Sequence, residues 1–206
     1  MGERLRIHPE TPQRRFVEQA AKCLADHGVV VLPTNTSYAL TAAPGSRSAI
    51  ERIARIKQIN PDKKLFSLIV PDLSDIARYA SVENHAYRII RRFLPGPYTF
   101  ILPATREVPR ILLAKRKTIG IRVPDHNVPR RIAEQAGGAL LATTMRLPEE
   151  PFALSDPDEI ERCVGHQVDL ILEDGWGEVE PSTLVDLTSG IPEVIRTGAG
   201  DPAPFA

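Results

Sequence analysis

The sequence has few of the features that mark disulfide-rich, zinc-binding or membrane proteins. It has only two cysteines, Cys23 and Cys163, which lie far apart and lack the spacing of a zinc site. No apolar run is long enough to span a membrane, and the N-terminal stretch MGERLRIHPETP does not resemble a signal peptide. We therefore expect a cytoplasmic protein without a disulfide scaffold.

An excess of charge of one sign is also missing, because 26 Lys and Arg residues balance 26 Asp and Glu residues. The distribution along the chain is nevertheless uneven. A basic stretch at 105–131 is followed by an acidic stretch at 149–180. A basic stretch in a neutral protein fits either a polyanion-binding surface or a solvated face.

Several common catalytic motifs are absent as well. The chain lacks a Walker loop, a G-x-G-x-x-G fingerprint, an H-E-x-x-H zinc motif and a G-x-S-x-G nucleophile elbow. Its five histidines are scattered without metal-ligand spacing, so no metal site is expected. Catalytic residues stay unassigned because no covalent nucleophile is evident. Any enzymatic activity would depend on positioning and charge stabilisation.

Helix and strand patterns alternate along the chain, with no internal repeat or linker. Pro12 begins a helix that ends near Gly28, and Val29–Leu32 is a strand with apolar residues on both faces. Ser48 opens a helix that runs through Gln58. Further strands are expected at 65–70, 98–102, 118–123, 139–144, 168–172, 183–187 and 193–196, and further helices at 74–79, 83–93, 128–135 and 156–164. This order predicts one α/β domain over residues 1–206, built on a mixed sheet.

Hydroxyl side chains follow or end two of the predicted buried strands. Thr34 and Thr36 come directly after the strand at 29–32, and Thr144 ends the strand at 139–144. Ligands of α/β proteins tend to bind outside strand ends, so these hydroxyls can line one site. They can equally well satisfy the backbone of local turns.

Two cations lie at positions where a ligand would explain them. Arg122 interrupts an apolar strand, and an arginine is costly to bury without an anionic partner. Lys57 lies at the end of a predicted helix, where it either interacts with the helix dipole or joins a binding site.

Five motifs occur in the order found in YrdC-type proteins. They are PTNTSYAL, RIKQINPDKKLFSLIV, FLPGPYTFILP, TIGIRVPDH and PSTLVDLTSGIPEVIRTGAG. The chain therefore resembles the YrdC/YciO family over about residues 29–198, and this family includes the threonylcarbamoyl-AMP synthases of tRNA modification. The stretches IHPETPQ, KRKTIGIRVP and GAGDPAPF are most similar to the YciO subgroup. The resemblance implies a twisted sheet of parallel and antiparallel strands, flanked by helices, with a concave basic cleft.

The resemblance also implies two binding surfaces. Residues that match the family's threonine and nucleotide site are Thr34, Thr36, Lys57, Arg122, Thr144, Ser182 and Arg196. Basic residues of an implied surface for double-stranded RNA, either tRNA or ribosomal RNA, are Arg55, Lys63, Lys64, Arg110, Lys115, Arg116 and Lys117.

Two positions depart from the pattern of the synthases. Ile59 stands where the family's Lys-x-Arg motif has arginine, and Arg146 stands where its Ser-x-Asn motif has asparagine. Removing one pre-organised donor typically slows a reaction about 10²–10³-fold, so two losses could abolish synthesis and leave binding intact. Arg146 could restore a charge from the opposite wall of the site.

The resemblance thus predicts a YciO-type protein that binds RNA and nucleotides and is related to threonylcarbamoyladenosine biosynthesis. One alternative is an L-threonylcarbamoyladenylate synthase, a nucleotidyltransferase that uses threonine, bicarbonate and ATP with Mg²⁺. Another is a hydrolase that acts on a related carbamoyl or adenylate substrate. No tightly bound cofactor and no membrane partner are expected.

Overall fold

The computed structural model describes residues 2–59, 66–113 and 117–205. Its strands are β1 (Glu3–Arg6), β2 (Val30–Leu32), β3 (Ala39–Ala42), β4 (Ser67–Ile69), β5 (Tyr98–Pro103), β6 (Thr118–Arg122), β7 (Leu140–Thr144), β8 (Leu170–Glu173), β9 (Thr183–Asp186) and β10 (Glu193–Arg196). Its helices are α1 (Arg14–Ala25), α2 (Arg47–Ile56), α3 (Ile76–Tyr79), α4 (Asn84–Phe93), α5 (Asn127–Gln135) and α6 (Pro157–Val164). Short 3₁₀ turns are η2 (Leu73–Asp75), η3 (Arg110–Leu112) and η4 (Ala203–Phe205).

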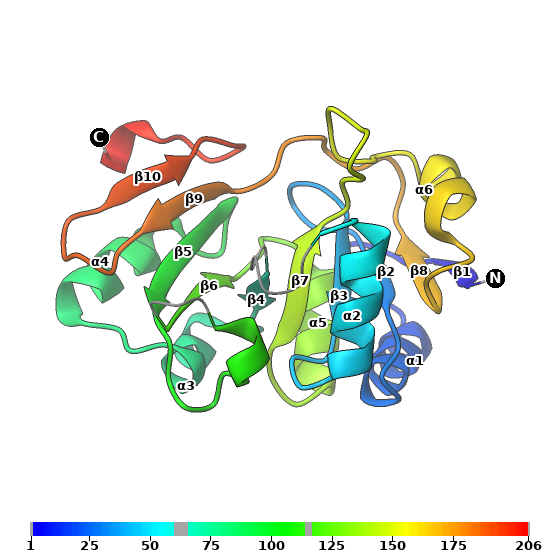
Figure 1. Cartoon of the computed structure of the whole chain (residues 1–206), viewed down its shortest axis with the longest axis horizontal. Helices are drawn as coiled ribbons and strands as arrows, with labels where there is room; N and C mark the ends of the chain where they lie inside the picture. Colours follow the sequence, from blue (N-terminus) through cyan, green and yellow to red (C-terminus); the bar gives the residue numbers. More distant parts are fainter. Residues whose placement is uncertain (1, 60–65, 114–116, 206) are drawn as a thin grey trace.

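The strands form one sheet in the order β1-β8-β2-β3-β7-β4-β6-β5-β9-β10 (Figure 1). Pairing is parallel between β1 and β8, β8 and β2, β4 and β6, and β5 and β9. The other neighbours pair antiparallel. The predicted mixed sheet flanked by helices is therefore confirmed.

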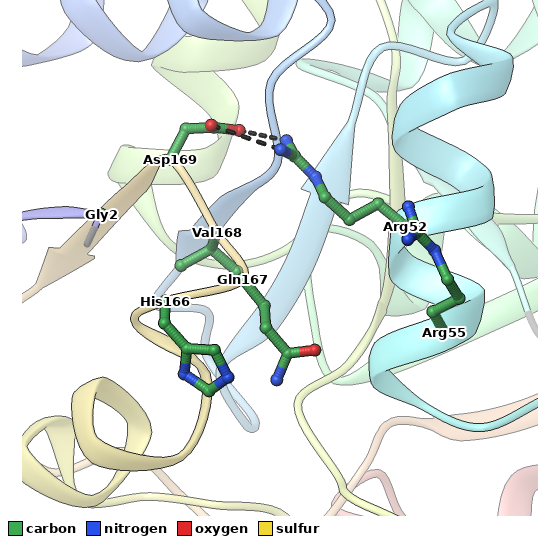
Figure 2. Close-up of a pocket in the computed structure, with 7 residues that line it drawn as sticks. All are labelled: Gly2, Arg52, Arg55, His166, Gln167, Val168 and Asp169. Atoms are coloured by element: carbon green, nitrogen blue, oxygen red, sulfur yellow. Dashed lines mark hydrogen bonds and ion pairs between the residues drawn. The ribbon is translucent and has the colours of Figure 1, made fainter.

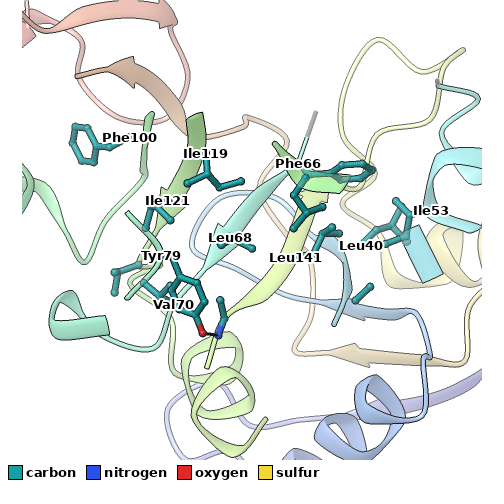
Figure 3. Close-up of a cluster of buried hydrophobic side chains, with 14 of the residues drawn as sticks. Leu40, Ile53, Phe66, Leu68, Val70, Tyr79, Phe100, Ile119, Ile121 and Leu141 are labelled. Carbon is teal, nitrogen blue, oxygen red and sulfur yellow. Dashed lines mark hydrogen bonds between the residues drawn. The ribbon is translucent and has the colours of Figure 1, made fainter. Parts of the chain in front are cut away.

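Successive residues of the central strands enter two different cores, because side chains alternate between the faces of a strand. In β2, Val30 and Leu32 pack with α1 and α5, whereas Val31 packs on the opposite face. The larger core includes Leu40, Leu68, Leu141 and Ile53, the last from α2 (Figure 3). Burial on both faces explains why these strands are uniformly apolar.

Most predicted elements are confirmed within two or three residues, but two strands were missed. β1 lies at the edge of the sheet, and its exposed Glu3 and Arg6 hide the apolar pattern. β3 follows the hydroxyl turn directly and pairs with β2 and β7. Residue 65, predicted to begin a strand, lies outside the described residues.

Two predicted helix starts were wrong by a few residues. α2 is capped by Ser46, whose side chain accepts from the Ala49 amide at 3.4 Å, and not by Ser48. α1 begins at Arg14, after the predicted start at Pro12. Asp156 and Pro157 open α6 as expected, since the Asp156 carboxylate accepts from the Asp158 amide at 2.9 Å. No helix within the described ranges is long and apolar enough to cross a membrane.

Truncating the core at the centre of the sheet should destabilise the protein strongly. Ile121 on β6 has no exposed surface, so Ile121→Ala should lower the free energy of unfolding by about 2–5 kcal/mol. Ile195→Ala on β10, where the side chain is 49% exposed, should change it by about 0.5 kcal/mol or less. Urea denaturation measures both values, and equal losses in the two variants would contradict this assignment of the core.

Candidate functional site

The turn after β2 satisfies part of its own backbone with its hydroxyls. Thr34 Oγ1 donates to the carbonyl of Ser37 at 2.7 Å and accepts from the Thr36 amide at 3.2 Å. The hydroxyls of Thr34 and Thr36 lie 3.1 Å apart, and both residues are buried. Local capping therefore explains Thr34, whereas the Thr36 hydroxyl also has a partner from another strand.

That partner is Arg122, which ends β6 and is buried. Its Nη2 donates to Thr36 Oγ1 at 2.9 Å and to Asn35 Oδ1 at 3.1 Å. Its Nε is buried and has no hydrogen-bond partner among the described residues. Burial, then the nearby charge of Arg196, lowers the pKa of Arg122 to about 10. Neutral oxygens thus hold the guanidinium, and the predicted anionic partner is not a carboxylate of the described chain.

Lys57 follows α2 and joins it to the end of β7. Its Nζ donates to the carbonyls of Thr144 at 2.7 Å and Arg146 at 2.8 Å. Burial, then the charge of Arg146, lowers the pKa of Lys57 to about 8. The ammonium bonds a different segment, so the helix dipole alone does not explain this residue. Thr144 contributes its backbone carbonyl to this contact.

The C-terminal pair, Ser182 and Arg196, lies at β9 and β10, which follow β5 at the end of the sheet. Arg196 Nη2 donates to the Ser182 carbonyl at 2.8 Å, and the Ser182 and Thr99 hydroxyls lie 2.6 Å apart. Partial burial, then the charge of Arg146, lowers the pKa of Arg196. Ser182 therefore orients Arg196 through its backbone, while its hydroxyl is satisfied inside the fold.

Four cations form what we call the cation cluster: Lys57, Arg122, Arg146 and Arg196. In addition to burial, the positive charge of Arg146 lowers the pKa of both Lys57 and Arg196, and the charge of Arg196 lowers the pKa of Arg122. Among the described residues, none of the four forms an ion pair with a carboxylate. Like charges without counterions are unfavourable, and an anionic ligand would relieve this repulsion.

The two departures from the synthase pattern have different surroundings. Arg146 is exposed and joins the cation cluster, where it raises the local positive charge. Ile59 packs, partly buried, against the main core, and its amide donates to the Ala54 carbonyl at 3.0 Å. The arginine position of the Lys-x-Arg motif is therefore an apolar packing position in this chain.

Several polar residues near the site had no clear signal in the sequence. Asn35 lies in the same motif as the predicted threonines but was not predicted as a site residue, and it accepts a hydrogen bond from Arg122. His126 caps α5 through Nδ1, and its Nε2 lies 2.8 Å from Asp174 Oδ2. Residues 126 and 174 are brought together only by the tertiary fold, so no local pattern could have paired them.

The predicted RNA surface is described only in part. Arg55 on α2, Arg110 in η3 and Lys117 before β6 are all exposed. The other four residues of this prediction, Lys63, Lys64, Lys115 and Arg116, lie outside the described residues.

The cavity drawn in Figure 2 lies beside α2 and the segment before β8, and has a volume of about 500 Å³. Its lining residues are Gly2, Arg52, Arg55, His166, Gln167, Val168 and Asp169. Arg52 pairs with Asp169, whose carboxylate also accepts from the Val29 amide at 2.7 Å. Among the predicted residues that the structure describes, only Arg55 lines this cavity, and the charges of Arg52 and Asp169 are paired with each other. We therefore place the candidate site at the cation cluster.

No group of three or more His, Cys, Asp or Glu side chains gathers in the described part of the chain in a way that could hold a metal ion.

Comparison with known proteins identifies relatives over the whole chain. A Sua5/YciO/YrdC family model, described as "Telomere recombination", matches residues 22–198. The protein YciO of Escherichia coli is 44% identical, with both chains fully covered. A threonylcarbamoyl-AMP synthase of Chromobacterium violaceum is 32% identical over 184 residues, which are 88% of this chain and 94% of that protein.

Solved structures agree with these sequence matches. The crystal structure of E. coli YciO superposes with a TM-score of 0.95, at 42% identity and full coverage of both chains. The crystal structure of P. abyssi Sua5 complexed with L-threonine has a TM-score of 0.85 at 24% identity, and covers 96% of this chain and 57% of Sua5. At that identity the likeness to Sua5 shows the fold alone. The family match and the full-length relatives together show that this chain belongs to the Sua5/YciO/YrdC family.

Proposed function

We propose that this protein binds a nucleotide, with the phosphates held by the cation cluster. The observation that carries the proposal is that buried Lys57 and Arg122 are held by neutral oxygens, while none of the four cations has a carboxylate partner among the described residues. Guanidinium and ammonium groups are the side chains that proteins use for phosphates. A triphosphate spreads several negative charges over a length that separate cations can share.

The family relationship supports ATP or an adenylate as the nucleotide. The relative from C. violaceum is a threonylcarbamoyl-AMP synthase, and the P. abyssi Sua5 structure is a complex with L-threonine. In this chain, the Thr36 hydroxyl and the Asn35 carboxamide already hold Arg122 in place. These neutral groups orient the guanidinium and leave its charge free for a ligand.

We favour nucleotide binding without efficient synthase activity. Electrostatic catalysis needs donors aimed at the charge that develops in the transition state. Ile59 offers no such donor, because its side chain packs against the core. Arg146 adds a charge, but its flexible guanidinium does not have the geometry of a short amide.

We also propose that RNA binds the exposed basic residues outside the cation cluster. Arg55, Arg110 and Lys117 are exposed on different elements, so they would contact phosphates along an extended strand or duplex.

Removing a cation of the cluster should weaken nucleotide binding. Arg146→Ala removes an exposed side chain without opening the core, so it should lower the affinity for ATP about tenfold or more. Arg131→Ala, on α5 and paired with Glu134, is the matched control and should bind as the original protein does. Isothermal titration calorimetry measures both affinities. Equal affinities in the two variants would remove the cluster from the site.

Nucleotide binding should take up a proton near pH 8.5 through Lys57. In the protein without nucleotide, Lys57 has a pKa of about 8, so its side chain is mostly the neutral amine at that pH. Bound phosphates would favour the charged ammonium. Calorimetry in buffers of different ionisation enthalpy should show this uptake. Lys57→Arg should abolish it, since a guanidinium stays charged. Uptake that persists unchanged in Lys57→Arg would assign the proton to another group.

RNA affinity should fall steeply with salt and depend on the exposed basic residues. The double variant Arg55→Ala/Lys117→Ala should lower the slope of log K against log salt by roughly one to two, because each phosphate contact contributes about 0.9 on duplexes. Filter binding with tRNA and with ribosomal RNA measures this slope, again with Arg131→Ala as the control. Absence of binding at low salt would contradict the RNA proposal and leave the nucleotide proposal standing.

A further inference from the structure

Two large aromatic side chains are exposed near the candidate site. Trp176 is 78% exposed and Phe152 is 65% exposed. Single exposed apolar side chains are common on protein surfaces, so exposure alone assigns no role to them. Their position relative to the cation cluster is what distinguishes them. We call this pair, Trp176 and Phe152, the aromatic rim.

The loop that carries Trp176 is fixed to the fold on both sides of the indole. Asp174 lies 2.8 Å from His126 Nε2, and the Tyr38 hydroxyl donates to the Gly175 carbonyl at 2.6 Å. Gly177 lies against the Tyr38 ring so closely that a Cβ would come within 2.8 Å of a ring carbon. The backbone is thus held while the indole stays in solvent. Binding of a partner to Trp176 would therefore cost little conformational entropy of this loop.

The segment that carries Trp176 is bonded to the turn that holds Arg122. The Glu178 amide donates to the carbonyl of Thr36 at 3.0 Å, and the hydroxyl of Thr36 accepts from Arg122 at 2.9 Å. Only Gly177 separates Trp176 from Glu178, so their Cα atoms lie at most about 7 Å apart. Thr36 therefore connects the segment that carries Trp176 to the guanidinium of Arg122 through one hydrogen bond on each side.

Phe152 lies on the loop that begins at another cation of the cluster. The chain leaves β7 through Arg146 and returns at Leu154, whose amide donates to the carbonyl of Met145 at 2.8 Å. One residue later, the Ser155 carbonyl accepts from the Gly177 amide at 2.9 Å. The loops of Phe152 and Trp176 are therefore neighbours, near the top of the view in Figure 1.

The charges beside the aromatic rim favour a neutral ring over a polyanion. Glu149 is exposed on the loop of Phe152, and Glu178 and Glu180 are exposed after Trp176. These carboxylates repel a phosphodiester backbone that would run past the aromatic rings. They do not repel an uncharged base.

We propose that the aromatic rim stacks on the base of a nucleoside triphosphate whose phosphates bind the cation cluster. The inference rests on the proposed nucleotide binding and adds the residues that distinguish a nucleotide from a bare polyphosphate. Stacking of a base on an aromatic side chain typically contributes about 1–3 kcal/mol, which corresponds to roughly 5- to 150-fold in affinity.

Trp176 is the single tryptophan of the chain, so its fluorescence reports on this position directly. ATP should quench the emission and bind roughly tenfold more tightly than inorganic tripolyphosphate, which carries the charge without a base. Trp176→Ala should bring the calorimetric affinity for ATP down to that for tripolyphosphate and leave tripolyphosphate binding unchanged. Trp176→Phe should retain most of the preference for ATP. Ile191→Ala, which removes a 76% exposed apolar side chain elsewhere, is the control and should retain all of it.

The outcomes separate this inference from the proposed function. If both ligands bind with equal affinity and the emission is unchanged, stacking is wrong and the phosphate site stands. If Trp176→Ala weakens both ligands equally, the loop supports the phosphate site and the stacking role is wrong. If neither ligand binds, the proposed function fails and the inference fails with it. Stronger quenching by single-stranded RNA than by ATP would also contradict a mononucleotide occupant.

Discussion

The candidate site depends on buried cations that are held by neutral oxygens. Lys57 donates to two backbone carbonyls at the exit of β7, and Arg122 donates to a hydroxyl and a carboxamide after β2. Carbonyls and hydroxyls orient a cation without cancelling its charge, whereas a carboxylate would neutralise it. The same contacts join α2, β6, β7 and the turn after β2, so the charge of the site and the packing around it depend on one another.

Much of the fold was predictable from local patterns. The apolar strands β2, β4 and β7 are buried on both faces, and this burial makes their sequences distinctive. β1 could not be found in the same way, because an edge strand with exposed Glu3 and Arg6 has no clear period. β3 was hidden because it is only four residues long and follows a polar turn.

The residues of the candidate site could be named from the sequence, but their arrangement could not. Residue patterns singled out Lys57 and Arg122, and the resemblance added Arg196. In the structure, burial and then a neighbouring positive charge lower the pKa of each of the three. The partners of these cations are mostly backbone carbonyls, such as those of Thr144 and Ser182, and a carbonyl has no signature in a sequence. The two departures also needed a structure, because only tertiary contacts distinguish Arg146 in the cation cluster from Ile59, which packs partly buried against the core.

The most direct test of the account is a crystal structure of the protein with a non-hydrolysable ATP analogue. The account predicts phosphate oxygens within hydrogen-bond distance of Lys57 or Arg122, with Arg146 and Arg196 turned toward the same phosphates. Phosphates bound instead in the cavity between α2 and the segment before β8, beside Arg55 and His166, would contradict it.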